Sequence, residues 1–167
     1  MPTTEGEIAV TAPDWRRLQT TIEPGVVVVA ETGNGRFEQA LLDGRHLVHA
    51  DEPGAVGGGD IGPSPYELLL MSLGACTSMT LRLYAKRKQW KLRRVVVRLR
   101  HRRAHAADCQ NCESPGARID RVERSIELIG ELDAEQRRRL LDIADMCPVH
   151  RTLSAGVDIR TALAEPG

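Results

Sequence analysis

Aromatic residues and net charge are both scarce in this sequence. One Phe, two Trp and two Tyr occur among 167 residues, too few for the aromatic platforms on which single-stranded nucleic acid stacks. The 23 Lys and Arg residues balance 23 Asp and Glu residues, so no net charge draws the chain toward nucleic acid. We therefore expect no nucleic-acid partner.

Targeting and membrane-spanning segments are also missing from the expected organisation. The N-terminal residues carry no apolar segment with a basic flank, so we expect a cytoplasmic protein. The apolar stretch 68–83 is about sixteen residues long, short of the ~20 that a membrane span needs. Four cysteines are present, and in a cytoplasmic protein these are more typical of redox or metal thiols than of structural disulfides.

The length and the pattern of turns predict one α+β domain. We predict an N-terminal extension over residues 1–22 and a single domain over 23–167. β-branched or alternating runs between Gly-rich turns predict antiparallel strands, and apolar or amphipathic stretches predict helices. Strands are expected at 26–30, 36–42, 45–50, 95–100, 119–129 and 157–163, and helices at 64–88, from 133 and from 148.

The stretch 64–88 is the centre around which the rest is expected to pack. Ser64, Pro65 and Glu67 have the arrangement of a helix cap with proline in the first turn. Residues 68–83 are apolar or small on nearly every face, which predicts a helix buried all round. Cys76 lies near the middle of this helix.

A second cysteine, Cys147, is followed by Pro148, which suits the first position of a short helix. Cys147 is thus predicted at or near the cap, where backbone N–H groups and the helix dipole stabilise a thiolate. The alternative for Cys76 and Cys147 is that each is a small buried hydrophobic side chain. His150, three residues later, either donates to the thiolate or packs at the helix end.

The remaining two cysteines, Cys109 and Cys112, have the spacing of half a zinc site. His101 and His105 lie upstream and make a Cys2His2 site conceivable. The pair could also cycle as a redox dithiol, or form a hairpin tip with two reduced thiols. Because no second pair follows, we expect no metal and no cofactor.

Two motifs together resemble one known family. The stretch P-x-E-L-L-L-x-x-L-G-A-C-T-x-M-T-L over 65–81, with the later C-P-V-H over 147–150, resembles the OsmC/Ohr family. The resemblance extends from about residue 36 to 163. The D-C-x-x-C-E insertion at 108–113 resembles the OsmC-like branch of that family.

The resemblance implies an OsmC-like fold, with antiparallel sheets wrapped around the central helix in an intertwined homodimer. It implies a peroxiredoxin-like thiol peroxidase of the oxidative stress response that reduces organic hydroperoxides. Cys76 matches the peroxidatic position and forms a sulfenic acid, and Cys147 matches the resolving position. An external thiol reductant, in this family often a dihydrolipoyl protein, would reopen the disulfide.

The family also supplies an arginine and a glutamate to activate the thiol. Our candidate cation is Arg36, with Arg45 second. In the reductases the glutamate directly follows the helix-starting proline, but here Tyr66 holds that place and Glu67 comes one residue later. Glu67 therefore has two interpretations, a site residue or only the capping partner of Ser64, and Glu52 is a possible substitute.

Two other functions fit the sequence. One is a non-catalytic dimeric module that binds an apolar ligand, and the other is a metal-stabilised protein that uses Cys109 and Cys112. The basic runs 98–103 and 137–139 are interpreted as solvated faces.

Overall fold

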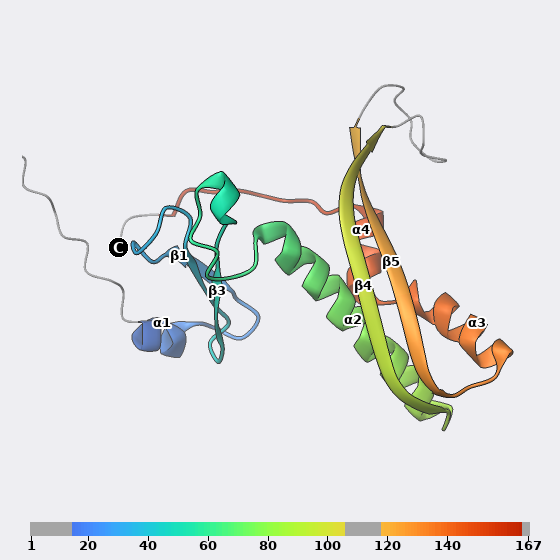
Figure 1. Ribbon diagram of the computed structural model, residues 1–167. Coiled ribbons are helices and arrows are strands. Elements are labelled where there is room, and N and C mark those ends of the chain that lie inside the picture. Colours follow the sequence, from blue (N-terminus) through green and yellow to red (C-terminus); the bar gives the residue numbers. More distant parts are fainter. Residues whose placement is uncertain (1–14, 106–117, 165–167) are drawn as a thin grey trace, which may run out of the picture. The chain divides into compact units, whose positions relative to one another are not determined.

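The computed structural model describes residues 15–105 and 118–164, which form a mixed α+β structure with two antiparallel sheets and one long helix (Figure 1). Its compact parts divide between Leu68 and Leu69, inside the long helix. The elements are α1 (Trp15–Thr21), β1 (Val28–Glu31), β2 (Gln39–Leu42), β3 (Leu47–Ala50), η1 (Gly54–Val56), α2 (Pro65–Arg87), β4 (Lys91–His105), β5 (Arg118–Glu131), α3 (Ala134–Ala144) and α4 (Pro148–Ala155).

The first unit contains the predicted meander. Strands β1, β2 and β3 pair in sequence order, each antiparallel to the next. Ala40, Leu42 and Ala50 are its buried apolar residues, in keeping with the period of two in a half-buried sheet. The described part of the predicted N-terminal extension forms α1, a helix that the sequence analysis did not predict.

The glycine-rich loop 51–63 is held by a buried carboxylate. The Asp51 side chain accepts hydrogen bonds from the backbone N–H groups of Glu52 and Gly59, both at 2.8 Å. A Cβ atom at Gly58 would collide with the Glu52 backbone, and one at Gly62 with the His49 backbone. Only glycine therefore fits these two positions.

Helix α2 begins as predicted. The backbone N–H and the hydroxyl of Ser64 both donate to the Glu67 carboxylate, at 2.8 and 2.9 Å. These bonds lower the pKa of Glu67, with the backbone N–H as the main cause. By length and apolar character α2 could also cross a membrane.

The prediction that α2 is buried all round is wrong for the single chain. Its buried residues, Leu73, Gly74, Thr77, Leu81 and Ala85, follow one stripe. Met71, Ala75, Met79 and Leu83 are exposed, and these four residues are called the apolar stripe below. The two stripes are offset by two residues and so lie about 200° apart around the helix. The apolar stripe is exposed because the hairpin and α3 pack against the other side of α2.

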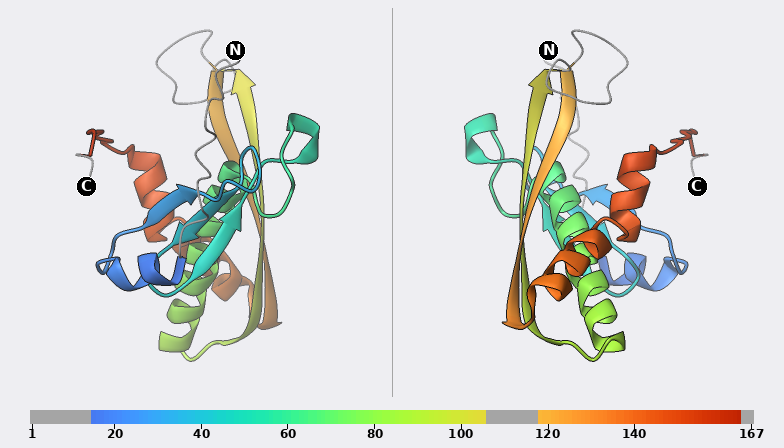
Figure 2. Two further views of the ribbon diagram at one scale, coloured as in Figure 1. Left: turned by 90° about the vertical axis from the view of Figure 1, so that its left-hand side faces the viewer. Right: turned by 90° about the vertical axis from the view of Figure 1, so that its right-hand side faces the viewer.

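Strands β4 and β5 form the long hairpin that the alternating pattern predicted, with Val97 opposite Ile126 and Leu99 opposite Arg124. Figure 2 shows the hairpin as one twisted ribbon, with α2 and α3 beside it. Cys109 and Cys112 fall between the two strands, outside the described residues.

The core of the second unit joins α2, the hairpin and α3. Its buried members are Leu81, Ala85, Leu92, Leu140, Ile143 and Ala144. Helix α3 starts with the predicted capping box, in which Asp133 and Gln136 satisfy each other's backbone N–H groups. This cap fixes where α3 begins and so which of its faces meets the core.

Two adjacent leucines on α3 give a matched test of this core. Leu140 is 0% exposed and Leu141 is 49% exposed. We expect Leu140→Ala to lower the free energy of unfolding by about 2–5 kcal/mol, because it leaves a cavity. Leu141→Ala should change it by less than about 1 kcal/mol. Urea denaturation followed by circular dichroism measures both, and equal losses would contradict the core assignment.

Helix α4 ends at Ala155, and the strand predicted at 157–163 is absent. These residues are exposed instead, with Ile159 at 81% and Leu163 at 98%. A strand needs a neighbour to accept its backbone hydrogen bonds, and the described residues of one chain give this segment none. The alternating pattern therefore marks a segment that is suited to pairing but unpaired here.

Candidate active site: two coupled thiols

Cys76 lies on α2, between the buried stripe and the apolar stripe, and it is partly exposed. It is a free thiol. Burial is the main cause that raises its pKa, and the neighbouring Cys147 raises it further. Hydrogen bonds involving the Val149 backbone and the Thr80 side chain oppose this increase.

Cys147 is fully buried and is the N-cap of α4, as the sequence predicted. Pro148 has no N–H to offer, and the backbone N–H of His150 donates to the Cys147 Sγ at 3.5 Å. Burial alone would raise the pKa of Cys147. The hydrogen bonds from the His150 N–H, Cys76, Thr77 and the Val149 N–H outweigh burial and lower it.

The Cys76 and Cys147 thiols interact with each other. Their interaction raises the pKa of Cys76 and lowers that of Cys147. Of the two thiols, Cys147 therefore has the lower pKa. Two interacting thiols of this kind are the arrangement from which a disulfide forms once one sulfur is oxidised.

Arg124 of β5 joins the segments that carry the two thiols. Its guanidinium donates to the Thr77 hydroxyl at 3.0 Å, to the Ala144 carbonyl at 3.2 Å and to the Asp145 carboxylate at 2.7 Å. Sequence analysis missed both Thr77 and Arg124. The available signal was the position of Arg124, which shares a strand face with the apolar residues Val122 and Ile126.

A hollow of about 490 Å³ lies between β5 and α4, and Arg124 and His150 are on its wall. The His150 Nδ1 lies 3.9 Å from the Asp145 carboxylate. His150 contacts Cys147 through its backbone N–H, which donates to the sulfur. Its imidazole is turned to Asp145 instead.

The predicted partners Arg36 and Glu67 belong to the first unit, whereas both thiols belong to the second. Arg36 lies over the Phe37 ring, 4.9 Å from its centroid. The Glu67 carboxylate is engaged by Ser64, which supports its capping interpretation. The activating role of Arg36 stays a prediction, as does that of Arg45.

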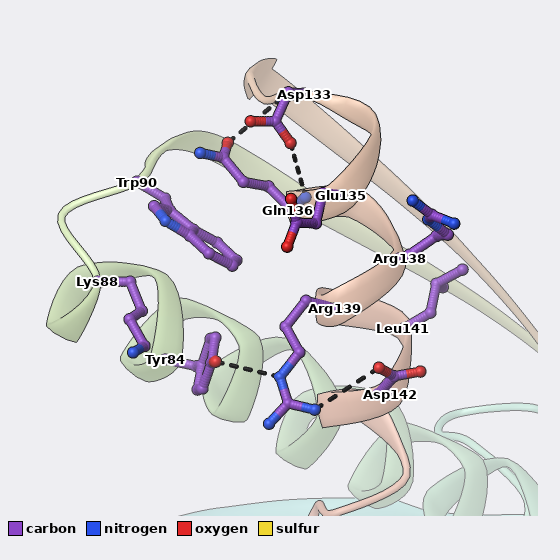
Figure 3. A pocket seen from close by; sticks show the side chains of 10 residues that line it. All are labelled: Tyr84, Lys88, Trp90, Asp133, Glu135, Gln136, Arg138, Arg139, Leu141 and Asp142. Atoms are coloured by element: carbon purple, nitrogen blue, oxygen red, sulfur yellow. Dashed lines mark hydrogen bonds and ion pairs between the residues drawn. The ribbon is translucent and has the colours of Figure 1, made fainter.

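A second hollow lies at the far end of α2 and contains no thiol (Figure 3). Arg139 reaches from α3 and donates to the Tyr84 hydroxyl at 3.2 Å, and the Tyr84 and Trp90 rings meet edge to face at 5.6 Å. Arg139 also lies 3.6 Å from Asp142. Because these charges pair with one another, the hollow is interpreted as a joint between α2 and α3.

No cluster of three or more metal-binding side chains occurs within residues 15–105 and 118–164. His101, a candidate zinc ligand, instead contacts Asp120 at 2.8 Å. Cys109 and Cys112 lie outside the described residues, so their metal and redox alternatives stay open.

The chain thus combines an α+β fold with two interacting thiols, Cys76 on a long helix and Cys147 at a helix cap. The sequence model of the OsmC family, described as OsmC-like protein, matches residues 57–162. The chain therefore belongs to the OsmC/Ohr family, as the two motifs predicted. No curated protein sequence matches it.

Solved structures share the fold at low identity. The OsmC-like protein from Mycoplasma pneumoniae is 16% identical with a TM-score of 0.61, and the match covers 77% of this chain and 86% of that one. An organic hydroperoxide resistance protein OsmC from Legionella pneumophila is 18% identical with a TM-score of 0.54, covering 75% and 85%. The organic hydroperoxide resistance protein OhrB of Bacillus subtilis is 20% identical with a TM-score of 0.52, covering 75% and 87%.

The coupled thiols predict a two-step titration. In protein carrying Cys109→Ser and Cys112→Ser, Cys147 should lose its proton at a lower pH than an ordinary thiol, because its pKa is lowered. Cys76 should lose its proton at a higher pH, because its pKa is raised. Ultraviolet thiolate absorbance against pH measures both steps. Adding Cys147→Ser should remove the lower step, and its survival would contradict the assignment.

Proposed function

We propose that this protein is a thiol-dependent peroxidase that reduces organic hydroperoxides through Cys76 and Cys147. The observation that carries the proposal is the interaction between the two thiols, which raises the pKa of Cys76 and lowers the pKa of Cys147. Cys76 is partly exposed and Cys147 is buried, so a peroxide reaches Cys76 first. The buried Cys147 sulfur is then protected from the oxidant and remains available to react with the oxidised Cys76.

The proposed reaction has two steps in the protein. Cys76 gives its proton to the Cys147 thiolate, and the resulting Cys76 thiolate attacks the outer peroxide oxygen. The O–O bond breaks, Cys76 becomes a sulfenic acid, and the alkoxide takes a proton and leaves as an alcohol. The Cys147 sulfur then attacks the Cys76 sulfur, a disulfide forms, and water leaves. Two thiols of an external reductant, in our proposal a dihydrolipoyl protein, restore the pair by exchange.

From the family pattern we further propose Arg36 and Glu67 as residues that activate the thiol. A cation beside Cys76 would lower a pKa that burial otherwise raises. Arg36 is the proposed cation because it matches the arginine of an early strand in the family pattern, and its guanidinium lies over the Phe37 ring in this structure. Glu67 is the less strongly supported of the two residues, because Ser64 already donates two hydrogen bonds to its carboxylate.

We also propose that the protein is a homodimer. The apolar stripe exposes Met79 at 70% and Leu83 at 62%, and exposed apolar surface of this kind marks a contact site. A membrane is the alternative partner for the apolar stripe. Against it, the same helix carries the charged residue Arg82, whose side chain donates to the Leu92 and Arg93 carbonyls. The unpaired segment 157–163 supports a partner chain that accepts its backbone hydrogen bonds.

A cytoplasmic location completes the proposal, because the resting state needs reduced thiols and the cytoplasm keeps thiols reduced. No membrane and no nucleic-acid partner is part of it.

The test is peroxide consumption by the reduced protein. We expect cumene hydroperoxide to be consumed with loss of two thiols per chain in protein carrying Cys109→Ser and Cys112→Ser. Hydrogen peroxide serves as the comparison oxidant. Absence of turnover, with an apolar molecule co-purifying, would favour a dimeric binding module and overturn the peroxidase.

A further inference from the structure

Arg124 is a charged side chain in an apolar setting, and the proposed chemistry has not yet used it. Its side chain is 13% exposed. It lies on the inner face of the hairpin, directly opposite Leu99 in the register. Burying a guanidinium is costly unless its N–H groups are satisfied, and here three acceptors from two other elements satisfy it.

Those three acceptors lie beside the two cysteines in the chain. Thr77 directly follows Cys76 on α2. Ala144 and Asp145 end α3, and only Met146 separates them from Cys147. One rigid guanidinium therefore holds the helix that carries Cys76 and the turn that carries Cys147. Arginine suits this task because its planar group donates in several fixed directions at once, which lysine cannot do.

Thr77 also connects the cation to the sulfur. Its hydroxyl oxygen accepts from Arg124 at 3.0 Å, and the interaction of its side chain with Cys147 is one of the causes that lower that thiol's pKa. An oxygen that accepts from a cation is a stronger donor through its own O–H, because hydrogen bonds in a chain polarise one another.

We propose that Arg124 is a positioning residue of the thiol site, which clamps the Cys76 helix to the Cys147 turn and orients the Thr77 hydroxyl toward the Cys147 sulfur. This inference deepens the proposed function and rests on it. The charged or titratable groups around Cys147 are Cys76 from α2, Arg124 from β5, Asp145 before the cap and His150 from α4. Of these, Arg124 donates hydrogen bonds to both thiol-bearing segments.

The test measures disulfide closure and thiol ionisation without any peroxide. In protein carrying Cys109→Ser and Cys112→Ser, diamide oxidises the reduced pair, and stopped-flow thiol loss gives the closure rate. We expect Arg124→Gln to slow closure by about tenfold to a hundredfold, because misplaced reacting groups lose rates of this size. The Cys147 titration step should also move to higher pH.

Arg98→Gln is the matched control, since it removes one arginine from the same hairpin. Arg98 pairs with Glu127 on the exposed surface. We expect it to match the parent protein in both measurements. If Arg124→Gln also lies within twofold of Arg98→Gln in closure rate and has the same titration, the proposal is overturned.

Two further variants keep the test decisive where Arg124→Gln does not fold. Arg124→Lys retains the charge but reaches fewer acceptors, so the titration should be restored in part and the closure rate should stay slow. Thr77→Val removes the hydroxyl with little change of shape, so the Cys147 step should move to higher pH. Parent-like behaviour in both variants would overturn the proposal.

Failure of the parent protein to consume hydroperoxide, with normal closure by diamide, would overturn the peroxidase function alone.

Discussion

Cys76→Ser should abolish hydroperoxide consumption, with a loss on the order of a thousandfold or more, as expected when a nucleophile is removed. The serine hydroxyl is not ionised at neutral pH, and it cannot form a sulfenic acid. The Cys147 thiol remains, with a lowered pKa in the parent protein, but it is fully buried. Single-turnover consumption of cumene hydroperoxide by the reduced variant measures the loss.

Cys147→Ser is the informative control for this result. It should still react once with the peroxide and then stop, because the Cys76 sulfenic acid has no resolving thiol. A sulfenic-acid trap such as dimedone should label Cys76 in this variant. If Cys76→Ser consumes peroxide as fast as the parent while Cys147→Ser does not, Cys147 is the nucleophile and the two roles are exchanged.

Met79→Glu should convert the proposed dimer to a monomer. A carboxylate on the apolar stripe would be buried in the contact without a partner, at a cost of several kcal/mol. About 4 kcal/mol corresponds to a dissociation constant about a thousandfold higher. Analytical ultracentrifugation over a range of concentrations measures the shift.

Leu141→Glu is the matched control, because it places the same charge at a partly exposed apolar position on α3. It should leave the association state unchanged. A parent protein that is monomeric at all concentrations would contradict the dimer, and binding of that monomer to lipid vesicles would assign the apolar stripe to a membrane.

Local sequence signals predicted those parts of the fold that short-range physics controls. The start of α2 at Ser64, the capping box at Asp133 and the cap position of Cys147 each depend on residues within one helical turn. The alternation of the β4–β5 hairpin likewise carries its own period. The family motifs added what no local signal contains, namely the meeting of Cys76 and Cys147.

The misses depend on contacts between distant residues. The composition of the stretch 68–83 predicts burial on every face. Which faces are buried, however, depends on how many other elements pack against the helix, and local sequence does not contain that information. The segment 157–163 has the pattern of a strand, but pairing requires an available sheet edge. Arg124 resembles any strand arginine until its three acceptors come together from α2 and the end of α3.

The capping role of Cys147 has a consequence for α4. In the reduced protein the Cys147 sulfur accepts the His150 N–H at the positive end of the helix dipole, where any negative charge on the sulfur is stabilised. A disulfide sulfur carries no charge and is a weaker acceptor, so oxidation removes that support from the first turn. The amides of the first turn of α4 should then exchange with deuterium faster in the oxidised protein. Oxidation of the Cys147 sulfur would in this way also affect the exposed residues beyond Gly156.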